Sequence, residues 1–256
     1  MKDTPSDKIP ILTYHSIDNS GSVISTNCET FRRQMKFLSE EAFNVISLKD
    51  LTRALEANNL LPPKTIVLTF DDGFQNFHAI ALPILKEVGF TATVFLITDF
   101  CGKHNDWSGN LAGLERSELM NWNEIKECSK YGIEFGSHTQ THPDLTKISI
   151  ETAEQEITLS KSKIEEKLGI AVTDFAYPYG KYNQAIKNII GGKFKTSCST
   201  ELGKYRSGDD LYSLKRLDTY YLSNERIFRS MMSANFDTYI NFRQIMRKLK
   251  SKWYNK

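Results

Sequence analysis

The chain has 256 residues, of which 33 are Lys or Arg and 31 are Asp or Glu, so its formal net charge is +2. Hydrophobic residues make up 40% and charged residues 25% of the chain, a composition that excludes a disordered, collagen-like or multi-span membrane protein. The near balance of charge argues against a nucleic-acid partner. A chain of this length buries enough apolar surface to fold around a core without disulfides.

The cysteines and the first residues bear on the compartment. Cys28, Cys101, Cys128 and Cys198 lie far apart in the sequence and include no C-x-x-C pair, which indicates a reducing compartment rather than a disulfide framework or a thiolate zinc site. Residues 1–10 contain no apolar stretch that could serve as a signal-peptide core. If Met1 is the natural start, these features predict a cytoplasmic protein.

Short β-rich runs alternate with amphipathic helices along the chain. Several runs are almost continuously apolar, as is typical of strands that are covered on both faces. The third expected helix has the clearest ends, because Ser149 precedes it as an N-cap and Gly169 follows it as a C′ residue. In chain order we expect a strand at 9–15, a helix at 30–42, a strand at 65–70, a helix at 77–88, strands at 92–97 and 132–138, a helix at 150–168, and strands at 174–178 and 194–198.

This alternation predicts βα units and a mainly parallel sheet. A length near 250 residues without an internal linker favours a single α/β barrel domain over an open sheet. We assign the barrel to residues 1–235 and a basic C-terminal helix or tail to residues 236–256. Residues 98–121 are rich in Gly, Asn, Asp and Ser and predict a long loop of the kind that often shapes a site.

The C-terminal segment differs in charge from the rest of the chain. Residues 241–256 hold six Lys or Arg and no Asp or Glu. Ile245, Leu249 and Trp253 recur every four residues and would form an apolar stripe along a helix. Two interpretations stay open: a helix that lies on an anionic membrane surface, and a terminal helix that packs this stripe on its own barrel.

Two adjacent carboxylates end the apolar strand at 65–70. Asp71 and Asp72, in the motif TFDDG, repel each other and lose hydration there, so the pair is costly unless a cation offsets it. Gly73 permits a turn directly after them. A solvated Asp-Asp-Gly turn is the alternative, but barrel enzymes keep their sites where strands end.

Two histidines follow the strand expected at 132–138. His138 and His142, in GSHTQTHPDL, have a spacing that on one helical turn lets two imidazoles bind one metal ion. A carboxylate would complete a three-ligand site with a position open for water. Surface or core histidines are the alternative for this motif alone. The acidic pair after another strand shifts the interpretation towards a metal site.

In chain order with FAYPYG at 175–180, these motifs resemble the polysaccharide deacetylase family, which has the NodB homology domain and is also called carbohydrate esterase family 4. The resemblance covers about residues 9–217. It is nearest to the subgroup that deacetylates poly-N-acetylglucosamine, whose members carry a histidine after the first strand. It implies a distorted (β/α) barrel with about seven units. It also implies a divalent metal, most often zinc, although the same ligands accept cobalt or nickel.

The resemblance implies a role for each motif residue. Asp72, His138 and His142 would bind the metal, which lowers the pKa of bound water and polarises the acetyl carbonyl. Asp71 would be the general base. The backbone N–H of Tyr179 would contact the oxyanion, and Tyr179 would also line the substrate site.

Other positions depart from the commonest family pattern. The chain has no histidine late in the sequence to act as the general acid, so we assign this role to His15 in LTYHSI, which matches the subgroup's histidine. Many members have an arginine that orients the base where this chain has Ala176. Arg216, in LKRLD, is the candidate replacement, because a base needs an orienting partner. Trp107 is a candidate for stacking on a sugar ring, and we give His78 and His104 no ligand role.

We therefore expect a metal-dependent deacetylase that removes acetyl from an N-acetylated sugar or glycan. A cytoplasmic location would favour a free, nucleotide-linked or lipid-linked sugar, and the basic tail would suit a lipid-linked glycan at the inner membrane face. Two alternatives stay open: a hydrolase of a non-sugar amide or cyclic imide, and a catalytically silent glycan-binding module. The first is harder to dismiss because the arginine at the position of Ala176 is missing. The silent binding module is disfavoured because the base, the metal ligands and an acid are all present.

Overall fold

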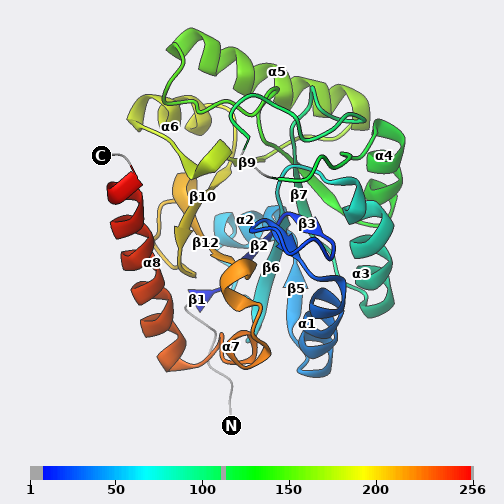
Figure 1. Ribbon diagram of the computed structural model, residues 1–256, viewed down its shortest axis with the longest axis vertical. Coiled ribbons are helices and arrows are strands. Elements are labelled where there is room, and N and C mark those ends of the chain that lie inside the picture. The colour runs from blue at the N-terminus through cyan, green and yellow to red at the C-terminus, as the bar shows by residue number, and fades with distance from the viewer. Residues whose placement is uncertain (1–7, 111–113, 255–256) are drawn as a thin grey trace.

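Figure 1 shows the computed structural model, in which residues 8–110 and 114–254 are described. Within these residues, seven parallel strands form a closed ring, as expected of a (β/α) barrel, because the seventh ring strand pairs with the first. An additional strand, β5 (Asn44–Ile46), pairs with the first half of one ring strand. Around the ring the order is β2 (Ile11–Tyr14), β12 (Leu214–Asp218), β10 (Thr196–Leu202), β9 (Asp174–Ala176), β8 (Glu134–Ser137), β7 (Thr93–Leu96) and β6 (Thr65–Phe70).

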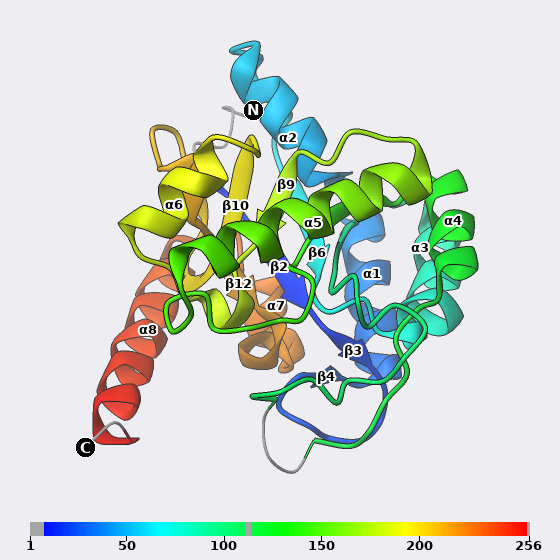
Figure 2. The same ribbon diagram turned by 90° about the horizontal axis from the view of Figure 1, so that it is seen from above.

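Helices surround this ring on its outer side (Figure 2), except α2 (Leu48–Glu56), whose Leu48 and Leu51 pack on the apolar side chains inside the ring. In the described part of the chain the helices are α1 (Cys28–Glu40), α2, α3 (Leu82–Val88), α4 (Trp122–Lys130), α5 (Ile150–Leu168), α6 (Gln184–Gly191), α7 (Glu225–Arg229) and α8 (Ala234–Tyr254). Two short strand pairs lie outside the ring: β1 (Lys8–Ile9) with β11 (Tyr205–Arg206), and β3 (Ser16–Ile17) with β4 (Ser25–Thr26).

Most expected elements form close to where the apolar patterns place them. The predicted ends of α5 are confirmed: the Ser149 hydroxyl accepts the N–H of Thr152, and Gly169 adopts a left-handed φ of 68°. The helix expected at 77–88 begins with a π-helical turn at Phe77–Ala81 before α3. The strand β12 was not expected, because its buried position 216 is an arginine and breaks the apolar pattern.

The two faces of the ring carry different apolar clusters. Side chains alternate between the faces of a strand, so one set points into the barrel and the other meets the helices. The outer set packs with the buried faces of α1, α3, α4, α5 and α6 in the larger cluster. The inner set includes Ile11, Val67, Phe95, Ala176, Cys198 and Leu214.

The C-terminal helix α8, which begins near the expected boundary at 235/236, packs its first turns on the core. Phe236 and Ile240 are buried, and the Arg247 guanidinium donates a hydrogen bond of 2.9 Å to the Thr200 carbonyl. In contrast, Ile245 is 57% exposed.

Two residues of the apolar stripe of α8 face solvent. Leu249 is 54% exposed, as Ile245 is at 57%, so the interpretation that packs the stripe on the barrel is wrong for these two residues. The side chain of Trp253 lies outside the described residues. No helix in the described ranges is both long and apolar enough to cross a membrane.

Candidate active site

The inward-facing rows of the barrel end in polar side chains at one mouth. Every second residue of a strand points into the barrel. Along β6 and just beyond it, the buried Val67 is followed on this face by Thr69 and then by Asp71. Along β12, Leu214 is followed on the same face by Arg216. The Arg216 guanidinium carbon lies 5.9 Å from the centre of the Phe95 ring, above the apolar interior. The barrel thus brings a carboxylate and a guanidinium from two strands into one buried place.

Asp72, His138 and His142 form one buried cluster, as the sequence predicted. The Asp72 Oδ1 atom lies 3.4 Å from His138 Nε2 and 3.6 Å from His142 Nε2, and the two Nε2 atoms are 3.2 Å apart. Within the described residues, this is the group of His, Cys, Asp and Glu side chains that could hold a metal ion. Its three ligand atoms face a common point.

The proton arrangement leaves these nitrogens available as ligands. The Nδ1 atom of His138 donates to the Ala176 carbonyl at 2.7 Å; because a carbonyl only accepts, Nε2 carries the lone pair in the neutral ring. Burial, and then the neighbouring His138, lower the pKa of His142 to about 3, which keeps that imidazole neutral. Burial alone would raise the pKa of Asp72, but its interactions with the neighbouring His138 and His142 lower it, so the carboxylate stays ionised.

The spacing of the three atoms fits a tetrahedral metal ion. Two ligands that each bind zinc at about 2.0–2.1 Å lie about 3.3–3.4 Å apart, close to the observed 3.2, 3.4 and 3.6 Å. Without a cation or a proton between them, these lone pairs would repel each other in a buried site. Two imidazoles and one carboxylate suit zinc, cobalt or nickel.

Strained backbone holds the cluster together. Asp72, His142 and Tyr179 all have positive φ values, of 70°, 61° and 58°, a region that residues other than Gly seldom adopt and that is concentrated at functional sites. The helical turn expected for the His138–His142 pair is therefore wrong. The two rings meet because the loop after β8 folds back through Thr139, whose φ is 68°.

Asp71 lies beside the cluster with a cation fixed on both its oxygens. The Arg216 guanidinium donates two parallel hydrogen bonds of 2.7 Å to Oδ1 and Oδ2. Burial would raise the pKa of Asp71, but the charge and hydrogen bonds of Arg216 outweigh it and hold that pKa well below its usual range. His15 stands at the mouth with its side chain 26% exposed, and its Nε2 lies 3.9 Å from Asp71 Oδ2. Asp71, Arg216 and His15 therefore lie close together in space, as the predicted roles of base, orienting cation and acid require.

Tyr179 and Trp107 flank His142. The ring centres of Tyr179 and Trp107 lie 4.6 and 5.0 Å from that of His142. The Tyr179 hydroxyl donates to the Gly109 carbonyl at 3.0 Å, which ties the long loop to the mouth. Trp107 is only 5% exposed, so it does not present the open ring face expected for stacking on a sugar. Its indole N–H is buried and has no hydrogen-bond partner among the described residues.

The remaining histidines lie apart from the cluster. His78 is on the outer helices, 3.1 Å from Glu127, and His104 forms a β-bridge with Glu118 in the long loop. The structure adds one contributor that the sequence analysis missed, the Ala176 carbonyl that orients His138. A backbone carbonyl has no residue-type signal, so no motif could have revealed it.

Comparison with known proteins identifies the same motifs. The sequence model of the polysaccharide deacetylase family matches residues 58–191. The chain is 27% identical over 235 residues to the Bacillus subtilis protein YxkH, which is named as a polysaccharide deacetylase; the match covers 91% of this chain and 76% of YxkH. It is 26% identical over 168 residues to a poly-beta-1,6-N-acetyl-D-glucosamine N-deacetylase of Staphylococcus aureus, covering 62% of this chain and 55% of that protein.

A solved structure shares the fold. The Streptococcus pyogenes deacetylase PplD, determined in complex with acetate, superposes with a TM-score of 0.73 at 29% sequence identity. The match covers 84% of this chain and 93% of PplD.

Proposed function

The chain belongs to the polysaccharide deacetylase family, and we propose that it is a metal-dependent deacetylase that hydrolyses the acetamide of an N-acetylated sugar or glycan. The observation that carries this proposal is the adjacency of two units. One is a buried trio of lone-pair ligands at tetrahedral spacing, and the other is a carboxylate fixed by a buried guanidinium. A divalent ion held by the trio would supply Lewis acidity, lowering the pKa of water and polarising the acetyl carbonyl.

The chain's own residues would then divide the proton transfers. Asp71 accepts the proton of the attacking water, since its carboxylate is ionised and each oxygen keeps a lone pair beside the Arg216 contact. Arg216 orients that carboxylate by its two-point contact. His15, at the exposed mouth, donates a proton to the amine as it leaves.

The turn after β9 would serve the oxyanion and the acetyl group. Tyr179 has a left-handed backbone with a φ of 58°, and its ring lies against His142 of the ligand cluster; its N–H would stabilise the developing negative charge. Trp107 would contribute its unpartnered indole N–H or ring edge, rather than a ring face, to the bound acetyl group. Both residues also shield His142 from solvent.

We propose N-acetylglucosamine units as the substrate, with β-1,6 linkage as the first choice. The support is the named activity of the Staphylococcus aureus relative and of the Escherichia coli poly-beta-1,6-N-acetyl-D-glucosamine N-deacetylase, of which this chain spans 20%. The whole activities of those longer proteins are not carried over.

The test is acetate release by the zinc-loaded chain from β-1,6- and β-1,4-linked N-acetylglucosamine oligomers. We expect turnover that is removed by a chelator, restored by zinc and absent in Asp71→Asn. Binding of the oligomers by calorimetry without any acetate release would favour a silent glycan-binding module instead. Turnover of small cyclic imides, with none on the oligomers, would favour the imide hydrolase.

We also propose that α8 makes peripheral contact with an anionic membrane at the cytoplasmic face. Four apolar side chains of α8 are exposed at helical spacing: Phe242, Ile245, Met246 and Leu249. The segment around them carries Lys and Arg without acidic residues, the pattern of an interfacial helix. Sedimentation with vesicles rich in phosphatidylglycerol should carry the chain down, and the double variant Ile245→Ser and Leu249→Ser should stay in solution. Equal binding of both proteins would contradict the contact.

A further inference from the structure

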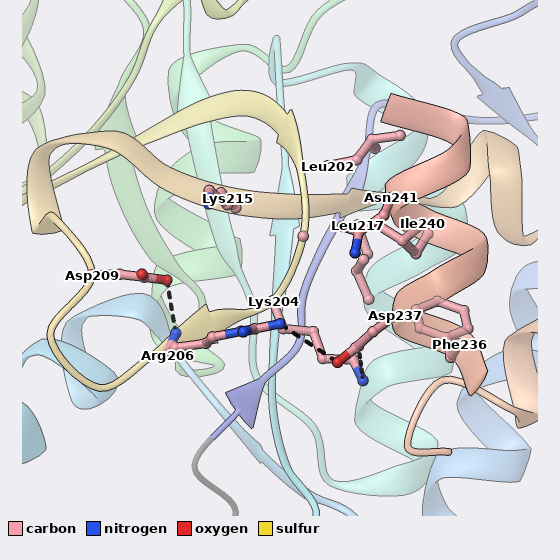
Figure 3. Close-up of a pocket in the computed structure, with 11 residues that line it drawn as sticks. Leu202, Lys204, Arg206, Asp209, Lys215, Leu217, Phe236, Asp237, Ile240 and Asn241 are labelled. Carbon is pink, nitrogen blue, oxygen red and sulfur yellow. Dashed lines mark hydrogen bonds and ion pairs between the residues drawn. The ribbon is translucent and has the colours of Figure 1, made fainter. Parts of the chain in front are cut away.

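A second cavity, separate from the ligand cluster, lies between α8 and the strands β10, β11 and β12. Figure 3 shows it, with the apolar side chains of the helix on one side and charged side chains along the strand segment. Its volume is about 310 Å³, at the lower end of the range for small-molecule sites. It is lined by Leu202, Gly203, Lys204, Arg206, Asp209, Lys215, Leu217, Phe236, Asp237, Ile240 and Asn241.

The charges around this cavity do not balance. The lining holds three cations, Lys204, Arg206 and Lys215, against two carboxylates, Asp209 and Asp237. Lys8, although outside the lining, is also paired with Asp237. The lining itself therefore carries an excess of one positive charge.

The carboxylate of Asp237 is already engaged. Lys204, which is buried, lies 3.0 Å from Asp237 Oδ1, and Lys8 is paired with Oδ2. Burial would raise the pKa of Asp237, but its hydrogen bonds with Lys8 and Lys204 lower it, so the acid stays ionised. The Arg206 guanidinium reaches the same carboxylate only at 3.6 Å, beyond hydrogen-bonding distance.

Two cations therefore keep their donors for another ligand. Asp209 accepts the backbone N–H of Arg206 at 2.9 Å, not its guanidinium. Lys215 is exposed, its stem packs over Gly203, and its ammonium has no hydrogen-bond or ion-pair partner in the described part of the chain. Both side chains line the cavity, and a guanidinium and an ammonium are groups that bind phosphate or carboxylate.

The opposite side of the cavity is formed by α8 and β12. Leu217, Phe236 and Ile240 lie there, but they are buried and present little surface to a ligand. A ligand would therefore meet mainly charged and polar side chains, including the exposed Asn241 amide.

We propose that this cavity is a binding site for a monosaccharide-sized anion, whose phosphate or carboxylate is held by Arg206 and Lys215. This cavity is distinct from the ligand cluster, because none of its lining residues is a metal ligand, base or acid of the proposed reaction. Binding of this anion does not depend on the proposed function.

The test is calorimetric titration of the full chain with four probes: inorganic phosphate, glucose 6-phosphate, glucuronate and glucose. We expect the sugar phosphate or the uronate to bind and glucose not to bind, with affinity that falls as salt is raised. The comparison of glucose 6-phosphate with glucuronate distinguishes the two anionic groups. Repeating the titration with Asp72→Asn excludes anion binding at the ligand cluster.

Two matched double variants make the result specific. Arg206→Ala with Lys215→Ala should weaken binding tenfold or more, and both side chains are exposed enough to be replaced without loss of fold. Lys36→Ala with Lys126→Ala removes the same charge from α1 and α4 and should leave affinity unchanged. Equal loss in both pairs, equal binding of glucose, or no binding of either anionic sugar would overturn the proposal. Acetate release, measured separately, reports on the proposed function alone.

Discussion

The Arg216 guanidinium donates hydrogen bonds of 2.7 Å to both carboxylate oxygens of Asp71, although the two residues are 145 positions apart in the sequence. Both are buried, and the guanidinium also donates to the Ser199 carbonyl and the Thr69 hydroxyl. Ala176, the last residue of β9, cannot supply a cation to the base, and Arg216 of β12 pairs with Asp71. The orienting charge is thus supplied from β12, which is separated by one strand from β6 on one side and from β9 on the other.

The first prediction concerns this pair. Arg216→Ala should lower the free energy of unfolding by about 3–5 kcal/mol, because it leaves a buried carboxylate without its partner. Arg216→Lys keeps the charge but loses the two-point contact, and the misplaced base should reduce kcat about 100-fold. Chemical denaturation and steady-state kinetics measure these effects. Arg229→Lys is the control, because it changes an arginine in an exposed ion pair on α7. An unchanged kcat in Arg216→Lys would contradict an orienting role.

The second prediction concerns the ligand trio. His138→Ala and Asp72→Asn should each abolish stoichiometric zinc binding, because two ligands no longer define a closed site. Elemental analysis after dialysis against zinc gives the metal content per chain. His78→Ala changes a histidine that lies 3.1 Å from Glu127 on the outer helices and should retain one ion. Retention of zinc by all three variants would place the metal elsewhere.

The third prediction separates the acid from the base. An aryl acetate has a leaving group that needs no proton, whereas the amine of an acetamide does. His15→Gln should therefore lose about 10²–10⁴-fold in acetamide hydrolysis while keeping most of its activity on the aryl ester. Asp71→Asn should lose both activities. Parallel loss of both activities in His15→Gln would assign His15 to a different role.

The fourth prediction uses a glycine at the mouth. A Cβ on Gly180 would meet Thr200 Oγ1 at 2.1 Å and its backbone nitrogen at 2.6 Å, at a φ of +67°. Gly180→Ala should displace the Tyr179 peptide and reduce kcat about 10²–10³-fold, with zinc content unchanged. Gly169→Ala has a similar φ of +68° and open space, so it isolates the backbone cost of about 1–2 kcal/mol. Normal turnover in Gly180→Ala would contradict a catalytic role for that peptide.

The fifth prediction concerns pH and a buried acid far from the ligands. Burial raises the pKa of Asp174, despite hydroxyl donors from Thr196 and Thr173. A raised folded-state pKa gives stability that is full below the unfolded value and is lost as pH rises through the folded value. The Tm of Asp174→Asn minus that of the wild type should therefore increase as the pH is raised from 4 to 7. The exposed Asp106→Asn should show no such trend, and a difference for Asp174→Asn that is constant with pH would contradict the shift.

The local features of this protein could be read directly from the sequence. The apolar run that becomes β6, the caps of α5 at Ser149 and Gly169, and the acidic pair followed by Gly73 all depend on near neighbours. The motif residues Asp72, His138 and His142 were placed in one site because each motif follows a strand, and parallel strands of a barrel end at one mouth.

The tertiary structure alone decided how distant residues meet. The strand β12 was hidden because its inward position carries Arg216, whose charge is acceptable only opposite Asp71. The Ala176 carbonyl orients His138, and Trp107 is buried against His142. Periodicity and turn chemistry act over a few residues, whereas these contacts depend on which strands become neighbours when the ring closes. A buried charge or an orphan carbonyl finds its partner only in the closed barrel.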